Sequence, residues 1–200
     1  MKKRLTILGG AAVAAIAASI LVYAPSASAA VGLHVSGRNI VEANGQTFVM
    51  RGVNHEHVWF TNQTASFANV KALGANTVRV VLSGGRWGTS SVSDVTNVIT
   101  LCKQNRLICV LEDHDTTGYG EQSGAVTLDK AVDYWVSVKD AVVGQEDYVL
   151  VNIGNEVGEQ YTADDGAAVA KRLCDIVREE DPGRPTTTAM NWAKSDMPLP

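Results

Sequence analysis

The sequence predicts an α/β fold of the (β/α)8 barrel type, preceded by a β-hairpin and ending after about the fifth strand. Short apolar segments alternate with amphipathic segments of helical period, which is typical of a parallel sheet covered by helices. Polar and aromatic residues directly follow each predicted strand, as in a barrel whose site is assembled from loops at the carboxyl ends of its strands. A doubly wound sheet is the alternative, but the Gly-rich phosphate loop that usually marks it is missing.

The elements are predicted in a regular order. Two short strands are expected around Asn44 and Gly45, a dipeptide typical of tight hairpin turns, and the second strand should continue through residues 48–54 into the barrel. Further strands are predicted where β-branched and apolar residues run together, at 76–82, 106–112, 147–153 and 185–190. Helices are predicted where apolar residues recur at helical spacing, within 62–75, 90–105, 127–144 and 162–183.

The first 29 residues have the layout of a secretory signal peptide. Basic residues precede an apolar run over 5–24, and small residues then suit cleavage after Ala29. A membrane anchor is the alternative, but Pro25 and the Ala-Ser-Ala tail favour cleavage. Residues 30–200 are therefore expected to be one secreted, extracellular domain with no membrane attachment.

Charge and cysteine content narrow the function classes. Without the three basic residues of the leader, 14 basic residues face 21 acidic ones, a net charge of −7, and no basic stripe with interleaved aromatic residues occurs, so nucleic acid is not an expected partner. Cys102 and Cys109 flank a short predicted turn and could form a disulfide in an oxidising compartment, which would leave Cys174 unpaired. Three buried, reduced cysteines are the alternative.

Residues suited to carbohydrate cleavage follow the predicted strands. A carboxyl group at Glu156, enclosed by aromatic residues, could donate a proton to a leaving oxygen, and the Asn155 amide could bind a sugar hydroxyl. Three further polar side chains should point to the same place, namely His57, Arg79 and His114. Three aromatic residues could stack on sugar rings, namely Trp59, Trp87 and Tyr119. Each residue alone could be structural, but together they indicate a carbohydrate-cleaving pocket.

Other chemistries are not indicated. The segment from Asp113 to Gly118 begins like a calcium loop, but its twelfth position is Gly124 instead of glutamate. His55 and His57 are two residues apart, a spacing that suits neither a zincin helix nor a complete ligand set. No G-x-S-x-G motif for a serine nucleophile occurs. No metal and no cofactor are therefore expected.

Residues from about 32 to 156 resemble the secreted bacterial β-mannanases of glycoside hydrolase family 5. The motifs that carry the resemblance are GVNHEHVWF, LGANTVRVVLS, VITLCKQNRLICVLEDHDTTGYGEQSGA, LDKAVDYWVSVK and EDYVLVNIGNE. The resemblance implies a (β/α)8 barrel that hydrolyses β-1,4-mannan internally with retention, and polysaccharide as the partner. It also implies roles for single residues: Glu156 matches the general acid/base, Asn155 its sugar-binding neighbour, and Arg79 the arginine that steadies the nucleophile. Three others match cleft residues, namely His57, Trp59 and His114.

The sequence departs from that family in three places. Glu56 and Asp113 stand where the family usually has smaller or apolar residues, so acidic side chains are expected near the mouth of the barrel. Val157 replaces a residue that is often proline or aromatic. From Val157 onward the chain is more similar to the barrel of glycoside hydrolase family 2, the β-galactosidase type. Because both families place Asn-Glu after strand 4, a chimeric join is expected near residues 153–157.

The resemblance places the catalytic nucleophile on a Glu of strand 7, and no such strand is present in the sequence. A retaining mechanism needs two carboxyl groups about 5–5.5 Å apart. Nearby carboxyl groups occur at Glu112, Asp113 and Asp115, but the resemblance gives none of them that role. The expectation is thus a mannan hydrolase whose chain is incomplete and whose open sheet edges favour self-association. A non-catalytic polysaccharide-binding remnant and a family 2 β-glycosidase are the alternatives.

Overall fold

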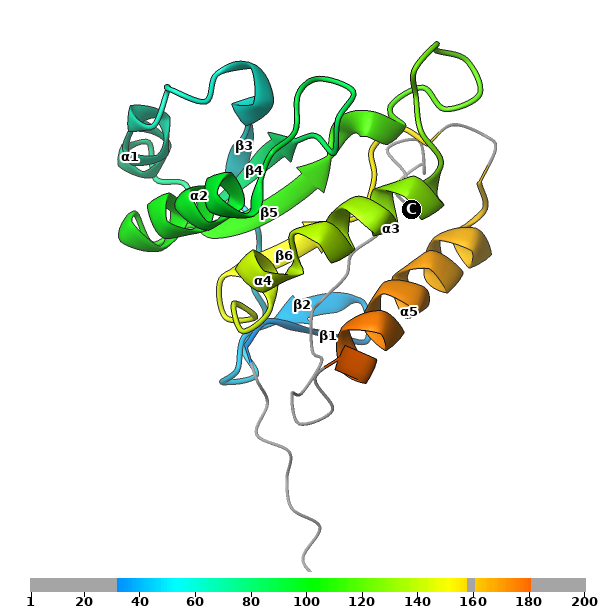
Figure 1. Ribbon diagram of the computed structural model, residues 1–200. Coiled ribbons are helices and arrows are strands. Elements are labelled where there is room, and N and C mark those ends of the chain that lie inside the picture. The colour runs from blue at the N-terminus through cyan, green and yellow to red at the C-terminus, as the bar shows by residue number, and fades with distance from the viewer. Residues whose placement is uncertain (1–31, 158–160, 181–200) are drawn as a thin grey trace, which may run out of the picture.

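The computed structural model describes residues 32–157 and 161–180 (Figure 1). Its centre is a parallel sheet in which neighbours in space are neighbours in the chain: β3 (Gly52–His55), β4 (Thr77–Leu82), β5 (Ile108–Asp113) and β6 (Val149–Asn152). A doubly wound sheet reverses its strand order at a switch point, whereas a barrel keeps the strands in sequence. The described sheet is therefore an arc of a (β/α)8 barrel, as the sequence predicts. The fifth predicted strand, 185–190, and the predicted leader, 1–29, lie outside the described residues.

Helices cover one face of this arc (Figure 1): α1 (Ala65–Ala72), α2 (Val92–Gln104), α3 (Leu128–Ser137), α4 (Lys139–Val142) and α5 (Ala163–Glu180). Three of them begin at side-chain caps: Ser91 Oγ accepts from the Asp94 backbone, Thr127 Oγ1 from that of Lys130, and Thr162 Oγ1 from that of Asp165. The single helix expected over 127–144 is in fact two. The break is at Val138, a β-branched residue whose φ of −110° leaves the helical range.

The N-terminal hairpin differs from the prediction in where it turns. β1 (His34–Ser36) pairs antiparallel with β2 (Asn39–Val41) around a two-residue turn that begins at Gly37, where φ is +60°. The expected turn at Asn44 and Gly45 does form, but it closes only an isolated bridge between Val41 and Thr47. Gly45 also has a positive φ, +82°, so both turns contain the glycine they favour, and the regular pairing of β1 with β2 is what distinguishes the hairpin turn. β3 is a separate strand, not a continuation of the hairpin.

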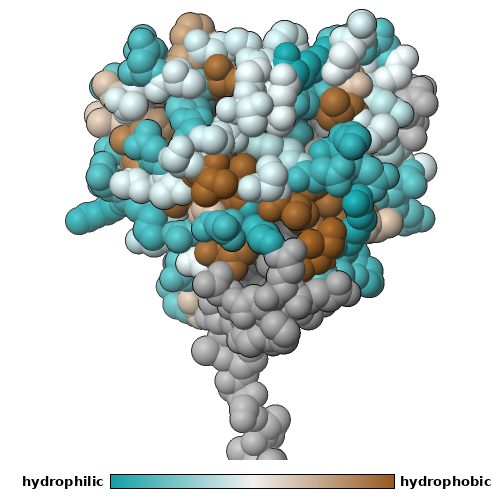
Figure 2. Space-filling model, viewed as in Figure 1, coloured by the Kyte–Doolittle hydropathy of each residue, from teal (hydrophilic) through white to brown (hydrophobic). Residues whose placement is uncertain are grey.

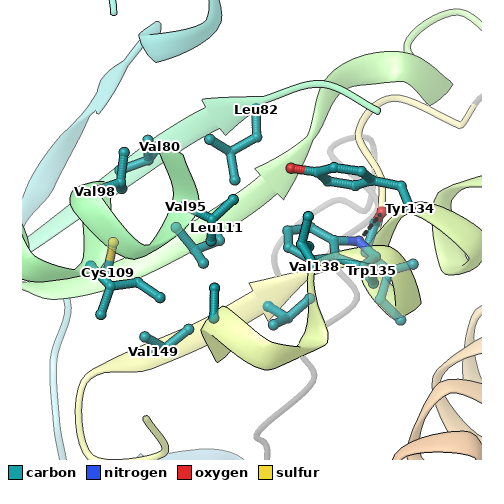
Figure 3. Packing of buried hydrophobic residues seen from close by; sticks show 14 of the residues in the cluster. Val80, Leu82, Val95, Val98, Cys109, Leu111, Tyr134, Trp135, Val138 and Val149 are labelled. Carbon is teal, nitrogen blue, oxygen red and sulfur yellow. Dashed lines mark hydrogen bonds between the residues drawn. The ribbon is translucent and has the colours of Figure 1, made fainter. Parts of the chain in front are cut away.

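The main core lies between the sheet and the helices (Figure 3). Side chains alternate along β4, so that Val78, Val80 and Leu82 pack against the helices while Arg79 lies on the opposite face. The Trp135 indole of α3 is buried there, and its Nε1–H donates to the Ile153 carbonyl oxygen at 3.0 Å. This bond fixes α3 beside the end of β6, where the predicted catalytic residues begin.

A second, smaller cluster fills the opposite face of the sheet near the amino ends of the strands. Its residues come from the hairpin and from β5 and β6: Leu33, Ile40, Phe48, Ile108, Val110 and Leu150. Toward the carboxyl ends the same face turns polar, with Glu112 in β5 and Asn152 in β6. Because the hairpin covers only the amino ends, this polar part is left to form a site.

Three cysteines lie in the part of the chain that the structure describes. Cys102 and Cys109 are buried free thiols, and burial, with the neighbouring Cys102 as a smaller cause, raises the pKa of Cys109 well above its usual range. Cys174 is half-buried, and the structure agrees with the alternative of reduced cysteines instead of a bridge between Cys102 and Cys109. On the face formed by the helices, hydrophobic residues reach the surface in a few separate places among polar ones (Figure 2). Among the described helices, none is long and apolar enough to cross a membrane.

Candidate active site

A pocket of about 560 Å³ lies at the carboxyl ends of the strands, and every described barrel strand or the loop after it contributes a residue. Its lining consists of Asn54, Glu56, Trp59, Arg79, Val81, His114, Asn152, Asn155 and Glu156. Five of the eight side chains that the sequence analysis assigns to the pocket are among them. The structure therefore brings together residues as far apart in the chain as Asn54 and Glu156.

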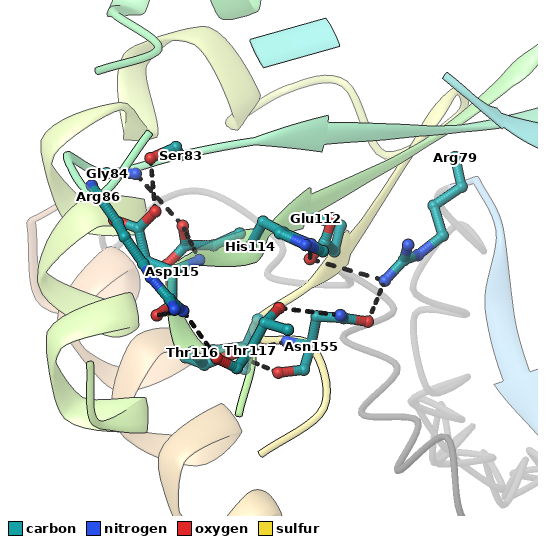
Figure 4. Close-up of polar contacts among 12 residues, drawn as sticks. Arg79, Ser83, Gly84, Arg86, Glu112, His114, Asp115, Thr116, Thr117 and Asn155 are labelled. Carbon is teal, nitrogen blue, oxygen red and sulfur yellow. Dashed lines mark hydrogen bonds and ion pairs between the residues drawn. The ribbon is translucent and has the colours of Figure 1, made fainter. Parts of the chain in front are cut away.

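Arg79 connects two of these strand ends (Figure 4). Its Nη2 donates to Asn155 Oδ1 at 2.7 Å and lies 3.7 Å from Glu112 Oε1. Glu112 is fully buried, and the same oxygen lies 3.0 Å from His114 Nδ1. A half-buried guanidinium between an amide and a carboxyl group has little freedom to turn, so Arg79 holds a fixed orientation in the pocket.

Asn155 is held by the loop that follows β5. The Thr116 hydroxyl lies 2.7 Å from both the backbone nitrogen and the backbone oxygen of Asn155, and Asn155 Nδ2 donates to Thr117 Oγ1 at 3.0 Å. A Cβ at residue 154 would lie 2.8 Å from Thr116 Oγ1 and 3.0 Å from a Leu128 methyl carbon. Glycine at 154 thus permits the close approach that lets Thr116 fix Asn155.

Glu156 points into the open pocket from a strained backbone. Its φ of +41° lies in the left-handed region, which a non-glycine residue adopts only where the surroundings impose it. Its carbonyl oxygen accepts from the Gly118 backbone at 2.9 Å, which stabilises this conformation. No side chain of the described residues bonds to its carboxyl group, which is exposed and not enclosed by aromatic rings as the sequence analysis expected.

Aromatic residues form one wall of the pocket. Trp59 and Trp87, each 42 % exposed, meet edge to face at 5.5 Å, and Trp59 meets the His114 ring at 5.4 Å. Trp87 is not itself part of the lining, but the Arg86 guanidinium lies 4.7 Å from its ring centroid. Tyr119 instead contacts Tyr161 at 5.4 Å. Two indoles with free surface are the kind of platform on which a sugar ring stacks.

The structure does not bring His57 to the pocket. Its side chain is 1 % exposed, and Nε2 lies 2.9 Å from Asp94 Oδ1 in the first turn of α2. The neighbouring His55 ring is 5.6 Å away, and burial lowers the pKa of His55. The short helix η1 (His57–Trp59) turns His57 toward α2 and Trp59 toward the pocket.

Asp113 also lies away from the pocket, whereas Glu56 lines it as expected. Strand alternation sends Asp113 to the helix side of β5, where it accepts from the Gly84 backbone at 3.2 Å. Burial, together with the charge of nearby Asp115, raises its pKa to about 8. Asp115 is bonded by the Ser83 hydroxyl at 2.5 Å and by the Arg86 backbone at 3.0 Å.

Sequence reasoning gave no role in this site to three polar strand residues, Asn54, Glu112 and Asn152. All three lie on the same face of the sheet as Arg79. The Asn152 amide nitrogen, when oriented to satisfy its neighbours, lies 2.7 Å from the Gly154 carbonyl oxygen. A polar residue in an apolar strand was the available signal. No group of three or more His, Cys, Asp or Glu side chains that could hold a metal ion occurs among the described residues.

Comparison with known proteins identifies relatives of the same kind. The chain is 60 % identical over 131 residues to a mannan endo-1,4-beta-mannosidase of Streptomyces lividans and 53 % identical over 142 residues to one of Cellvibrio japonicus. These matches cover 64 % and 70 % of this chain but 34 % and 32 % of those enzymes. The chain thus spans about a third of the length of either relative.

Solved structures agree with the fold. A Thermomonospora fusca β-mannanase in complex with mannohexaose matches with a TM-score of 0.68 and 58 % identity, over 71 % of this chain and 50 % of that one. A Streptomyces thermolilacinus β-mannanase with mannohexaose matches with a TM-score of 0.71 and 53 % identity, over 82 % of this chain and 54 % of that one. The resemblance to family 5 and the barrel fold are therefore confirmed.

The match to a family model extends beyond the pocket. It covers residues 41–196, including the tail that we expected to resemble family 2. That second resemblance is not confirmed, and the join near residues 153–157 stays a prediction. Since the family model matches more than three-quarters of the sequence, the chain belongs to the cellulase family, glycosyl hydrolase family 5.

Proposed function

We propose that the protein to which this sequence belongs hydrolyses β-1,4-mannan internally and with retention, with Glu156 as the general acid/base. The observation that carries the proposal is the pocket that Glu156 lines beside Asn155, together with Trp59 of the aromatic pair Trp59 and Trp87. The printed names of the relatives, mannan endo-1,4-beta-mannosidases, supply the substrate. Mannohexaose in two similar structures supports polysaccharide as the partner.

Each side chain receives a role in this proposal. Glu156 protonates the leaving glycosidic oxygen and then activates water, which requires a carboxyl group reachable by substrate and not engaged by the protein. Asn155 offers its amide to a sugar hydroxyl, Arg79 orients Asn155 and steadies the second carboxyl group, and Trp59 and Trp87 stack on sugar rings. His57 acts indirectly, by holding η1 and thus Trp59, through its bond to Asp94.

The second carboxyl group, the nucleophile, has to lie about 5–5.5 Å from the acid/base. We propose that it comes from a part of the barrel other than the described residues. Glu56 is the other pocket-lining carboxyl group among them, and the resemblance gives it no catalytic role. We also propose that residues 1–29 direct export and that residues 30–200 belong to the mature extracellular protein.

The test uses two proteins: the 200-residue chain, and the same chain extended by the remaining part of the barrel from the Streptomyces lividans relative, here called the extended protein. The extended protein should release reducing sugar from β-mannan, while its Glu156→Gln variant should bind mannohexaose but cleave mannan at least about 100-fold more slowly. The matched control is Glu56→Gln, a change of the same kind in the same pocket. Binding of mannohexaose without any turnover by the unchanged extended protein would favour the non-catalytic alternative.

Export is tested separately. Mass spectrometry of culture supernatant should find a protein whose first residue is near Ala30. A cell-bound product that retains Met1 would contradict the proposed leader.

A further inference from the structure

We propose that Glu112 is a positioning residue, which fixes the tautomer and orientation of His114 so that His114 Nε2 faces the sugar. The inference rests on the proposed function for the identity of the ligand, but its central observation is independent of substrate. Glu112 was one of the carboxyl groups to which the sequence assigned no role. In the structure it is fully buried between two side chains of the pocket.

The geometry determines which nitrogen of His114 carries a proton. Nδ1 lies 3.0 Å from Glu112 Oε1, and the always-positive Arg79 guanidinium lies 3.7 Å from the same oxygen. An oxygen that faces a guanidinium is an acceptor, so Nδ1 is the donor to it. In the neutral ring the proton then resides on Nδ1, and Nε2 is left with a lone pair.

The ring is also held in place on a second side. Trp59 meets His114 at 5.4 Å with an interplanar angle of 87°. The side chain of His114 is 21 % exposed and lines the pocket. With Nδ1 bound to Glu112 and the ring against Trp59, Nε2 is the polar atom of His114 left for a sugar hydroxyl.

The burial of Glu112 separates this role from catalysis. The residue has no exposed surface, so its carboxyl group cannot touch substrate. Its second oxygen, Oε2, has no hydrogen-bond partner among the described residues, so its contacts to His114 and Arg79 are what hold it. Through Arg79 the same carboxyl group also supports Asn155, which Arg79 contacts at 2.7 Å.

Other charged groups lie near the pair. Arg79 approaches from β4, Glu56 from the loop after β3 and Glu156 from the loop after β6, all in the same pocket. Asp113 is next to Glu112 in the chain but faces the helix side of the sheet. Among the described residues, none of these other carboxyl groups bonds to His114, so Glu112 is the acceptor that sets its tautomer.

The test is nitrogen-15 NMR of the histidine side chains in the extended protein at a pH where His114 is neutral, with its signals identified by comparison with His114→Gln. The unchanged protein should show a protonated Nδ1 and an unprotonated Nε2. Finding the proton on Nε2 would overturn the proposal without any variant.

Two variants of Glu112 extend the test. Glu112→Met keeps an unbranched side chain of similar length but removes the acceptor, so His114 should lose its single tautomer. We expect kcat on mannan to fall about 10–100-fold, the scale of loss known for partners that orient metal-bound histidines. Glu112→Gln retains an acceptor oxygen and should restore the tautomer and most of kcat. A protonated Nδ1 that persists in Glu112→Met would contradict the proposal.

Asp94→Asn is the matched control, because Asp94 is the carboxyl partner of a different histidine, the buried His57. It should alter the His57 signals and leave the proton of His114 on Nδ1, because the tautomer of His114 depends on Glu112. If the unchanged extended protein shows the expected His114 tautomer but does not hydrolyse mannan, the proposed function fails and the positioning role of Glu112 stands.

Discussion

Glu112 and Asp113 are adjacent in the chain, yet the sheet gives them opposite surroundings. Glu112 faces the polar end of the barrel interior, beside Arg79 and His114. Asp113 faces the helices, where its Oδ2 has no hydrogen-bond partner among the described residues and Tyr134 of α3 lies nearby. Two carboxyl groups one residue apart therefore have different consequences, one for the site and one for stability.

Asp113 predicts a pH dependence of stability. Its pKa is about 8 in the folded protein, raised by burial and by Asp115, against an ordinary value of 3.8. Between these two values the folded state binds a proton that the unfolded state has released, so stability falls as the pH rises and the full cost is present above about pH 8. Asp113→Asn should therefore raise the melting temperature at pH 8–9 and change it little near pH 4, where both states are protonated.

Thermal unfolding of the extended protein followed across this pH range checks the prediction. Asp140→Asn, at an exposed carboxyl group in α4, is the matched control and should not change the pH profile. An equal shift of the melting temperature for Asp113→Asn at every pH would show that the ionisation of Asp113 is not the cause.

At the scale of the elements, the loop after β4 is clamped to the loop after β5 by Arg86. Its Nη1 donates to the Thr117 carbonyl oxygen at 2.7 Å, its Nη2 to Gln122 Oε1 at 3.1 Å, and its guanidinium lies over the Trp87 ring. Thr117 in turn bonds to Asn155. Arg86 thus links the aromatic wall to the amide of the pocket.

Removing the contacts of Arg86 should weaken substrate binding more than it slows the chemical step. Arg86→Gln loses the cation–π contact and the bonds to both Thr117 and Gln122, so Trp87 is no longer held in one orientation. We expect KM for mannan to rise about tenfold, which corresponds to about 1.4 kcal/mol, with kcat changed less than about twofold. Steady-state kinetics of the extended protein measures both constants.

Lys103→Gln is the control for this prediction, because it removes a cation 5.4 Å from the ring of Tyr148, away from the pocket. It should leave both constants unchanged. A fall in kcat for Arg86→Gln with KM unaltered would contradict a role in holding the aromatic wall.

Regular elements and strand-end residues could be predicted from the sequence, because both depend on local patterns. The strand around Arg79 and the helix that begins after Ser91 lie where alternation and capping indicate. The partner of His57 could not be predicted, because Asp94 is 37 residues away and meets it only when α2 packs on the sheet. The role of Glu112 was missed for the same reason, since it depends on Arg79 from the neighbouring strand.

At the scale of the whole molecule, the described sheet ends at β3 on one side and β6 on the other. A closed barrel has no sheet edges, whereas each edge of an open sheet presents unpaired N–H and C=O groups. Val53 in β3 is 56 % exposed, so one edge also carries apolar surface. Edges of this kind pair with other chains unless something covers them.

The 200-residue chain is therefore expected to self-associate and to cleave little or no mannan. Size-exclusion chromatography should give dimers or larger species, and a reducing-sugar assay on β-mannan should stay near background. The extended protein is the control and should be a monomer, because its edges are paired within one barrel. A stable monomer of the 200-residue chain that unfolds cooperatively and cleaves mannan would contradict this expectation.

The assignment of Glu156 is tested most directly by separating proton donation from bond cleavage. In the extended protein, Glu156→Ala should slow hydrolysis of mannan about 10²–10⁴-fold, because the leaving sugar needs a proton. An aryl mannobioside with a nitrophenol leaving group needs none, so formation of its glycosyl-enzyme should be much less affected. Azide, which attacks without a general base, should restore turnover and yield a mannobiosyl azide. Loss of less than about tenfold on mannan, or equal losses on both substrates with no effect of azide, would contradict Glu156 as the general acid/base.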